Sequence, residues 1–218
     1  IDKKSYTDIN ITTKNVPLPL LFNAFAPKQL RNTYDFKSAN LSSSFKLEGK
    51  MKEAVATANI ELKDFDISDK AKNIAVKNNL FTSSFKYKSK DSDFNGKINN
   101  NNLQILFPKT GSIFRIPKID SLIQYGDIYL NQNLIYFNDK SAFLYSGNVI
   151  NYINPQNIDF KVIGEFNTDD LIKFIGQEIK PFLHSKGNIP IDINFSGNNQ
   201  RQTLFVQALA DKSGFITP

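Results

Sequence analysis

From about Phe36 to the end of the 218-residue chain, apolar and polar side chains alternate in short stretches that Gly, Asn, Asp and Pro interrupt. A period of two residues is typical of a β-strand that has one buried face and one exposed face. The apolar positions of the clearest stretches are Ala56, Ala58, Ile60 and Leu62; Phe81, Phe85 and Tyr87; Leu103, Ile105 and Phe107; Ile158, Phe160 and Val162; and Ile191, Ile193 and Phe195. The sequence therefore predicts a mainly β protein whose strands repeat one apolar face.

Composition and length favour one folded unit. The chain is 40% hydrophobic and 22% charged, and its 19 Phe and 8 Tyr are sufficient for a substantial core. All-β domains run to roughly 200–250 residues, so we interpret residues 1–218 as a single β segment. Because the sequence begins at Ile1 without a signal-peptide pattern, we expect this segment to belong to a larger protein.

The alternation and the turn residues between stretches predict the individual strands. A polar strand is expected at 5–14, two strands between 36 and 67, and further strands within 122–150, where turns are expected at 131–133 and 138–140. An Asn-rich turn is expected at 99–102. The remaining strands are predicted at 73–76, 80–88, 92–99, 102–107, 112–119, 158–166, 189–197 and 203–210.

Two short helices interrupt the strands. Residues 18–25 follow Pro17 and include Pro19, and proline suits the first turn of a helix. A second helix is predicted at about 168–183, with Thr168 as N-cap and two aspartates in the first turn. Its apolar stripe is formed by Leu171, Ile172, Ile175, Ile179 and Phe182.

Catalytic and metal-binding residue types are sparse. The chain has one histidine, His184, and no cysteine, which excludes disulfides, thiolate metal sites and metal sites built from several histidines. No nucleophile elbow or phosphate-binding glycine pattern is present, and the closest carboxylate pairs, such as Asp64 and Asp66, precede turns. We therefore expect a protein that is not an enzyme and that has no cofactor and no metal site.

The positive charge does not indicate a nucleic-acid partner. The net charge is +6, but the 27 Lys and Arg residues are dispersed, and the longest basic run is Lys3-Lys4. Nucleic-acid-binding proteins more often cluster these residues on one element. A β-barrel that stacks bases on Tyr and Phe is the weakest of three hypotheses, and we expect no nucleic acid.

Two architectures are compatible with one repeated apolar face. The first is a long curved antiparallel sheet that forms an open groove and carries one or two short capping helices. The second is a closed β-sandwich, in which the apolar rows of two sheets face each other. A groove would bind apolar ligands, whereas a sandwich would be a structural or protein-interaction module that uses its edge strands.

Three stretches resemble a known family. Residues 18–49 combine an apolar Leu-Pro segment, a short helix and a strand that enters Gly49; residues 119–130 lead into Tyr125-Gly126-Asp127-Ile128-Tyr129. Residues 158–197 run from a strand through a helix to a strand that closes at Gly197. Over about three quarters of the chain, this order resembles the central region of AsmA-like bacterial envelope proteins of the YhdP branch.

The resemblance implies a periplasmic β-groove, anchored to the inner membrane through a segment outside this sequence. Such a groove shields the acyl chains of phospholipids and aids their transport between the inner and outer membranes. The family supplies no catalytic residues. The expected lipid-facing residues are the apolar ones of the alternating stretches: Ile60, Leu62, Phe85, Leu103, Ile105, Ile158, Phe160, Ile191 and Phe195.

Overall fold

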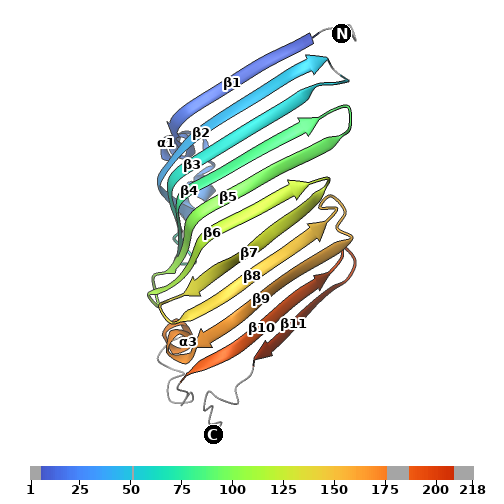
Figure 1. Cartoon of the computed structure of the whole chain (residues 1–218). Coiled ribbons are helices and arrows are strands. Elements are labelled where there is room, and N and C mark those ends of the chain that lie inside the picture. The colour runs from blue at the N-terminus through green and yellow to red at the C-terminus, as the bar shows by residue number, and fades with distance from the viewer. Residues whose placement is uncertain (1–5, 51, 176–186, 209–218) are drawn as a thin grey trace.

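A computed structural model describes residues 6–50, 52–175 and 187–208 as one antiparallel sheet of eleven strands (Figure 1). Each strand pairs with the next one in the sequence, and β1 and β11 are the two edges. The long sheet is confirmed, and the closed sandwich does not form. The strands are β1 (Tyr6–Pro17), β2 (Tyr34–Lys50), β3 (Val55–Asp69), β4 (Ile74–Lys88), β5 (Asp93–Phe107), β6 (Ser112–Gln124), β7 (Asp127–Phe137), β8 (Ser141–Ile150), β9 (Asn157–Asn167), β10 (Asn188–Gly197) and β11 (Gln202–Ala208).

Three short helices accompany the sheet. Helices α1 (Leu18–Phe25) and α2 (Lys28–Thr33) connect β1 to β2, and α3 (Thr168–Ile175) follows β9. The helix predicted at 18–25 is confirmed with these bounds. Figure 1 shows α1 and α3 at the same end of the strands, with most of the sheet uncovered.

Two predicted turns are wrong. The Asn-rich stretch 99–102 lies inside β5, so the strands predicted at 92–99 and 102–107 are one strand, and those at 73–76 and 80–88 are likewise joined in β4. The stretch 131–133 is a register shift inside β7, and the actual turn is Tyr125-Gly126, where both residues have positive φ. Asparagine tolerates the left-handed conformation in a bulge as well as in a turn, which explains the error at 99–102, where Asn102 has a φ of 58°.

Asn102 belongs to a bend that crosses the sheet. Asp64, Asn79, Asn102 and Pro117 are unpaired positions that follow one another across β3 to β6, and we call them the bend line. Asp64 and Asn102 have φ of 52° and 58°, and Pro117 has no N–H to leave unpaired. Strands β2 to β5 turn sharply at the end where α1 lies (Figure 1).

The bend line changes which residues of a strand share a face. Ile105 pairs with Phe114, which pairs with Phe137, which pairs with Ser141 in β8. Opposed residues of an antiparallel pair lie on the same face, and so do residues two apart along a regular strand. Ser141 and Gly147 therefore share a face, and Gly147 is linked through Leu130 and Ser121 to Ile98. Ile98 and Ile105 thus point to one side although seven residues separate them.

A cluster of phenylalanines holds α3 against the sheet. The ring of Phe174 in α3 lies 5.1 Å from that of Phe107 and 5.4 Å from that of Phe137. Phe137 is fully buried and also contacts Phe114 at 4.4 Å and Phe166 at 5.1 Å. This cluster is the main hydrophobic core, because most other apolar residues of the sheet keep part of their surface exposed.

Polar contacts complete the attachment of α3. The Asp170 carboxylate is buried, and its Oδ2 accepts hydrogen bonds from the backbone N–H of Lys140 (3.1 Å) and from the N–H (2.9 Å) and hydroxyl (2.7 Å) of Ser141. The predicted cap was wrong by one residue, because Asn167 Oδ1 accepts the Asp169 N–H and Thr168 is already helical. The predicted continuation of this helix to residue 183, with His184, lies outside the described residues.

Phenylalanine rings lie flat over glycines of neighbouring strands. A Cβ added to Gly147 would lie 2.2 Å from Cδ1 of Phe160 and 2.7 Å from the Asp159 carbonyl oxygen. Phe85 covers Gly96 in the same way, and Phe143 covers Gly164. Glycine is required at these positions because any side chain would displace the ring.

Replacing Gly147 by alanine is therefore expected to lower the free energy of unfolding by about 1–3 kcal/mol, the usual cost of overpacking. Urea denaturation followed by circular dichroism measures this change. Ser146→Ala is the matched control, since the neighbouring side chain points to the opposite face. Equal stability of both variants would contradict the contact.

Candidate functional site

One face of the sheet carries an uninterrupted row of paired residues across all eleven strands. We call it the Ile60 row, and it consists of Thr13, Ser43, Ile60, Ser83, Ile98, Ser121, Leu130, Gly147, Phe160, Phe195 and Leu204. Strands lie about 4.8 Å apart, so eleven strands span about 48 Å, which exceeds the ~30 Å hydrocarbon core of a bilayer. The row is long enough for an extended apolar chain.

A second row lies two residues away along each strand. This Phe85 row consists of Ile11, Phe45, Ala58, Phe85, Gly96, Ile123, Ile128, Val149, Ile158, Gly197 and Gln202. Neither row contains a charged residue. Together with the residues that continue them on the same side, the two rows define what we call the apolar face.

The apolar face is incompletely covered. Ile60 is 36% exposed, Phe45 38% and Tyr87, which continues the face beyond Phe85, 41%. Helices α1 and α3 cover only the end beyond the bend line, where Phe22 of α1 contacts Phe36 at 5.5 Å. Ile60, Phe45 and Tyr87 therefore keep apolar surface that a ligand can cover.

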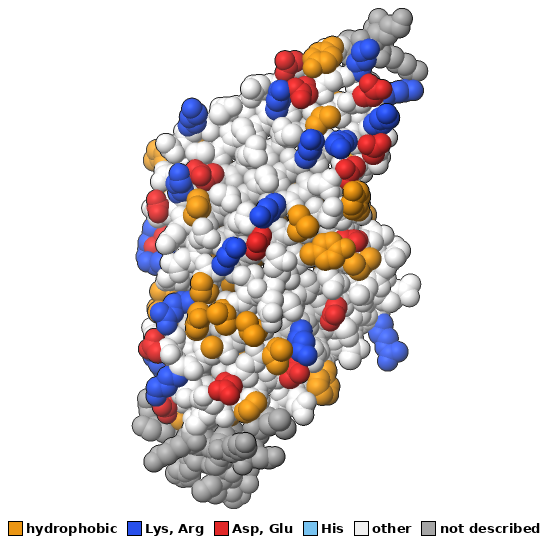
Figure 2. Space-filling model, viewed as in Figure 1, with side chains coloured by type: hydrophobic (Ala, Val, Ile, Leu, Met, Phe, Trp, Pro, Cys, Tyr) orange, Lys and Arg blue, Asp and Glu red, His pale blue; other side chains and the backbone are white. Residues whose placement is uncertain are grey.

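The opposite face holds the charges. Its middle row consists of Thr12, Ser44, Asn59, Ser84, Lys97, Leu122, Tyr129, Asn148, Asp159, Ser196 and Thr203. Ion pairs such as Lys77 with Asp66 at 3.0 Å lie on it, and Figure 2 shows charged side chains scattered over it. Hydrophobic side chains on this polar face gather over β7 to β9, where Leu134, Leu144 and Ile163 pair (Figure 2). Over most of the sheet, the two faces therefore differ in that the polar face carries charged side chains and the two rows of the apolar face carry none.

All nine residues expected to face a lipid lie on the apolar face. Ile60, Phe160 and Phe195 belong to the Ile60 row, and Phe85 and Ile158 belong to the Phe85 row. Leu62 and Ile191 continue the same face along β3 and β10. Leu103 and Ile105 lie beyond the bend line, toward the helix-covered end. The structure therefore brings the nine residues together on one face. Seven lie on its open part, and Leu103 and Ile105 lie toward the end that the helices cover.

The prediction missed several residues of this face. Ile98, Ile123, Ile128, Val149 and Phe45 contribute apolar surface to the two rows. The small residues of the Ile60 row were also missed, because hydroxyls and glycines give no apolar signal. Isolated glycines within predicted strands were the available clue, since they mark close approach of a neighbouring side chain.

One tyrosine on the apolar face is tied to a distant strand. The Tyr145 hydroxyl donates a hydrogen bond to the backbone carbonyl of Lys118 at 3.1 Å and so reaches from β8 to β6. Burial raises the pKa of this phenol above its ordinary value, which keeps it a neutral hydrogen-bond donor. The contact fixes the curvature of the sheet across β7.

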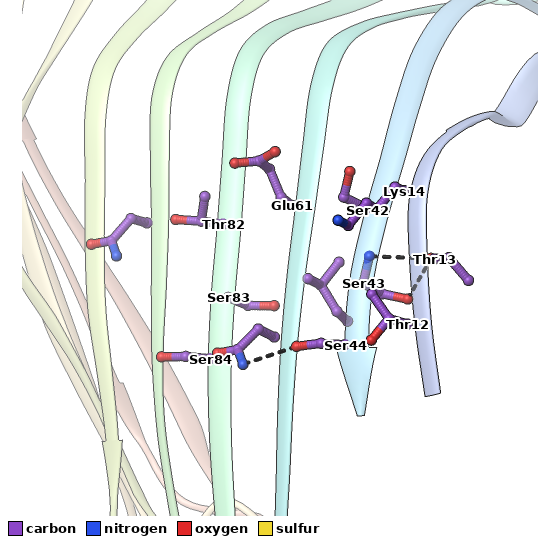
Figure 3. Close-up of a pocket in the computed structure, with 13 residues that line it drawn as sticks. Thr12, Thr13, Lys14, Ser42, Ser43, Ser44, Glu61, Thr82, Ser83 and Ser84 are labelled. Carbon is purple, nitrogen blue, oxygen red and sulfur yellow. Dashed lines mark hydrogen bonds between the residues drawn. The ribbon is translucent and has the colours of Figure 1, made fainter. Parts of the chain in front are cut away.

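A hollow of about 400 Å³ lies over β1 to β5 (Figure 3). Side chains of the polar face line it, including Ser42, Ser44, Thr82 and Ser84, and they alternate with residues of the Ile60 row. Asn59 Nδ2 donates to Ser44 Oγ at 3.2 Å. The hollow is shallow, and Ile60 contributes apolar surface among its hydroxyl-bearing side chains.

The carboxylate pair singled out in the sequence is not a binding site. Asp64 lies on the bend line, where its carbonyl accepts the Ser38 hydroxyl at 2.6 Å, and Asp66 pairs with Lys77. Within residues 6–50, 52–175 and 187–208, no three His, Asp or Glu side chains are grouped as metal ligands would be. In the same ranges, no helix is long and apolar enough to cross a membrane.

Comparison of the chain with protein-family models, with curated proteins and with solved structures found no match.

Proposed function

We propose that the apolar face shields the acyl chains of phospholipids, and that the chain is a non-catalytic periplasmic segment of an AsmA-like protein that aids phospholipid transport between the inner and outer membranes. The observation that carries the proposal is the absence of charge from two rows that cross all eleven strands, on a face that stays partly exposed. A metal-dependent catalytic role has no comparable support, because no three His, Asp or Glu side chains of the described residues are grouped as metal ligands would be.

The chemistry of the face suits hydrocarbon. Each methylene removed from water contributes roughly 0.8 kcal/mol, so an acyl chain lying across several strands is held by burial alone. Ser83 and Ser121 are small and buried, and they alternate with Ile60 and Ile98 along the Ile60 row. Lysines of the turns, such as Lys90 and Lys109, lie at the rim of the sheet and are available to phospholipid head groups.

Native mass spectrometry of the gently purified chain tests the proposal. We expect adducts with the masses of phospholipids, which organic extraction removes and added phospholipid restores. Absence of adducts both after purification and after incubation with phospholipid would overturn it.

A protein-interaction role is the second candidate, and the edge strand β11 favours it. This strand carries no charge, and Leu204, Phe205 and Val206 are all more than half exposed, on both faces of the sheet. Uncharged edge strands pair readily with another strand. Gln207→Lys on β11 is expected to prevent such pairing and to leave lipid adducts unchanged, which separates the two functions.

A further inference from the structure

Helix α1 is apolar on both of its sides. Phe22 contacts the sheet through Phe36 at 5.5 Å. The other side exposes Leu20 (66% exposed), Leu21 (42%) and Phe25 (81%), and Leu30 of α2 adds a fourth exposed apolar residue (45%). We call Leu20, Leu21, Phe25 and Leu30 the outer patch. Helices that are apolar all round are normally buried. The outer patch is therefore a surface that we expect another molecule to cover.

The surroundings of the outer patch are basic. Residues 18–33 contain Lys28 and Arg31 and no Asp or Glu. The β3–β4 turn lies against α2, where the Lys70 N–H donates to the Thr33 carbonyl at 2.9 Å, and it adds the cations of Lys70 and Lys72. The Asp69 carboxylate of this turn accepts two backbone N–H groups at 2.9 Å. None of the four cations forms an ion pair with a described residue.

We infer that α1 and α2 dock on the surface of an anionic lipid bilayer. Exposed leucine and phenylalanine enter the boundary between head groups and acyl chains, and the neighbouring lysine and arginine side chains meet the lipid phosphates. A protein groove would cover the apolar patch but gives no reason for the four cations around it, which have no ion-pair partner among the described residues, although Arg31 Nη1 also donates to the Asn23 carbonyl at 3.1 Å. The inference concerns a membrane contact and does not depend on acyl chains being held by the apolar face.

The position of the helices gives this contact a geometric consequence. Through Phe22 and Phe36, α1 lies on the side of the sheet that carries the apolar face, at the end beyond the bend line. A bilayer that holds the outer patch therefore lies next to one end of the apolar face. If both proposals hold, acyl chains enter the apolar face at this end.

Flotation with vesicles tests the inference on the 218-residue chain. We expect the protein to float with mixed phosphatidylcholine and phosphatidylglycerol vesicles, less with phosphatidylcholine alone, and progressively less as salt rises. Lys28→Gln combined with Arg31→Gln is expected to weaken partitioning at least about tenfold, since each cation near an anionic surface contributes about 1 kcal/mol. Leu20→Asn combined with Phe25→Asn is expected to weaken it similarly.

Ile153→Asn is the matched control, because Ile153 is 82% exposed on the β8–β9 turn, at the other end of the strands (Figure 1). It should float like the unmodified chain. Failure of the unmodified chain to float, or unchanged flotation of either double variant with native circular dichroism, would overturn the inference. Ile60→Asp, which is expected to abolish lipid adducts, should still float, so the membrane contact and the proposed function fail independently.

Discussion

Replacing Phe137 by alanine is expected to lower the free energy of unfolding by about 3–5 kcal/mol, the range for a fully buried phenylalanine. The ring of Phe137 contacts those of Phe114, Phe166 and Phe174, so its loss leaves a cavity between the sheet and α3. Urea denaturation monitored by circular dichroism measures the change. This cost is a large part of the about 5–15 kcal/mol by which a typical domain is stable, so the variant is measured at low temperature to retain a folded baseline.

Leu134→Ala is the control for this prediction. Leu134 lies on the polar face of the same strand and is 40% exposed, so its truncation removes less packing. We expect its effect to be less than half of that of Phe137→Ala. A Phe137→Ala variant as stable as Leu134→Ala would show that the aromatic cluster is not the core of the fold.

Replacing Ile60 by aspartate is expected to lower phospholipid capture at least tenfold while the fold is retained. A carboxylate in contact with hydrocarbon and without a partner costs several kcal/mol, and each 1.4 kcal/mol is a tenfold change in affinity. Ile60 is 36% exposed and is flanked by Ser43 and Ser83, so water reaches the new carboxylate when no lipid is bound. Native mass spectrometry of lipid adducts measures capture, and circular dichroism checks the fold.

Asn59→Asp introduces the same charge on the adjacent residue, which points to the polar face. Lipid capture by this variant should equal that of the unmodified chain. Equal loss in both variants would indicate a general effect of charge, and no loss in either would remove Ile60 from the lipid-binding surface.

The alternation of side chains was sufficient to predict most of the strands and a common face for the nine expected lipid-facing residues, although it divided β4 and β5 into two strands each. Ile60, Phe85 and Phe160 come from three separate stretches, and the pairing register places all three on the apolar face. Residues two apart in a strand point to the same face, and so do opposed residues of neighbouring antiparallel strands. Together, these two rules assign each residue of a regular sheet to one face.

The bend line could not be predicted in this way. Asn102 has the same local signature in a turn and in a bulge, and only pairing with strands on both sides distinguishes the two. The contribution of Gly96 and Gly147 was also hidden, because it depends on rings that belong to neighbouring strands. Bulges and ring–glycine contacts depend on residues of a neighbouring strand, so the local pattern of residues does not reveal them.

Lipid binding by the apolar face is tested most directly by photocrosslinking with a phospholipid that carries a photoreactive group on its acyl chain, followed by mapping of the modified residues. We expect adducts on Ile60, Phe85 and Ile98 of the apolar face and few on Asn59, Ser84 and Lys97 of the polar face. Adducts distributed equally over both faces, or concentrated on the polar face, would contradict it.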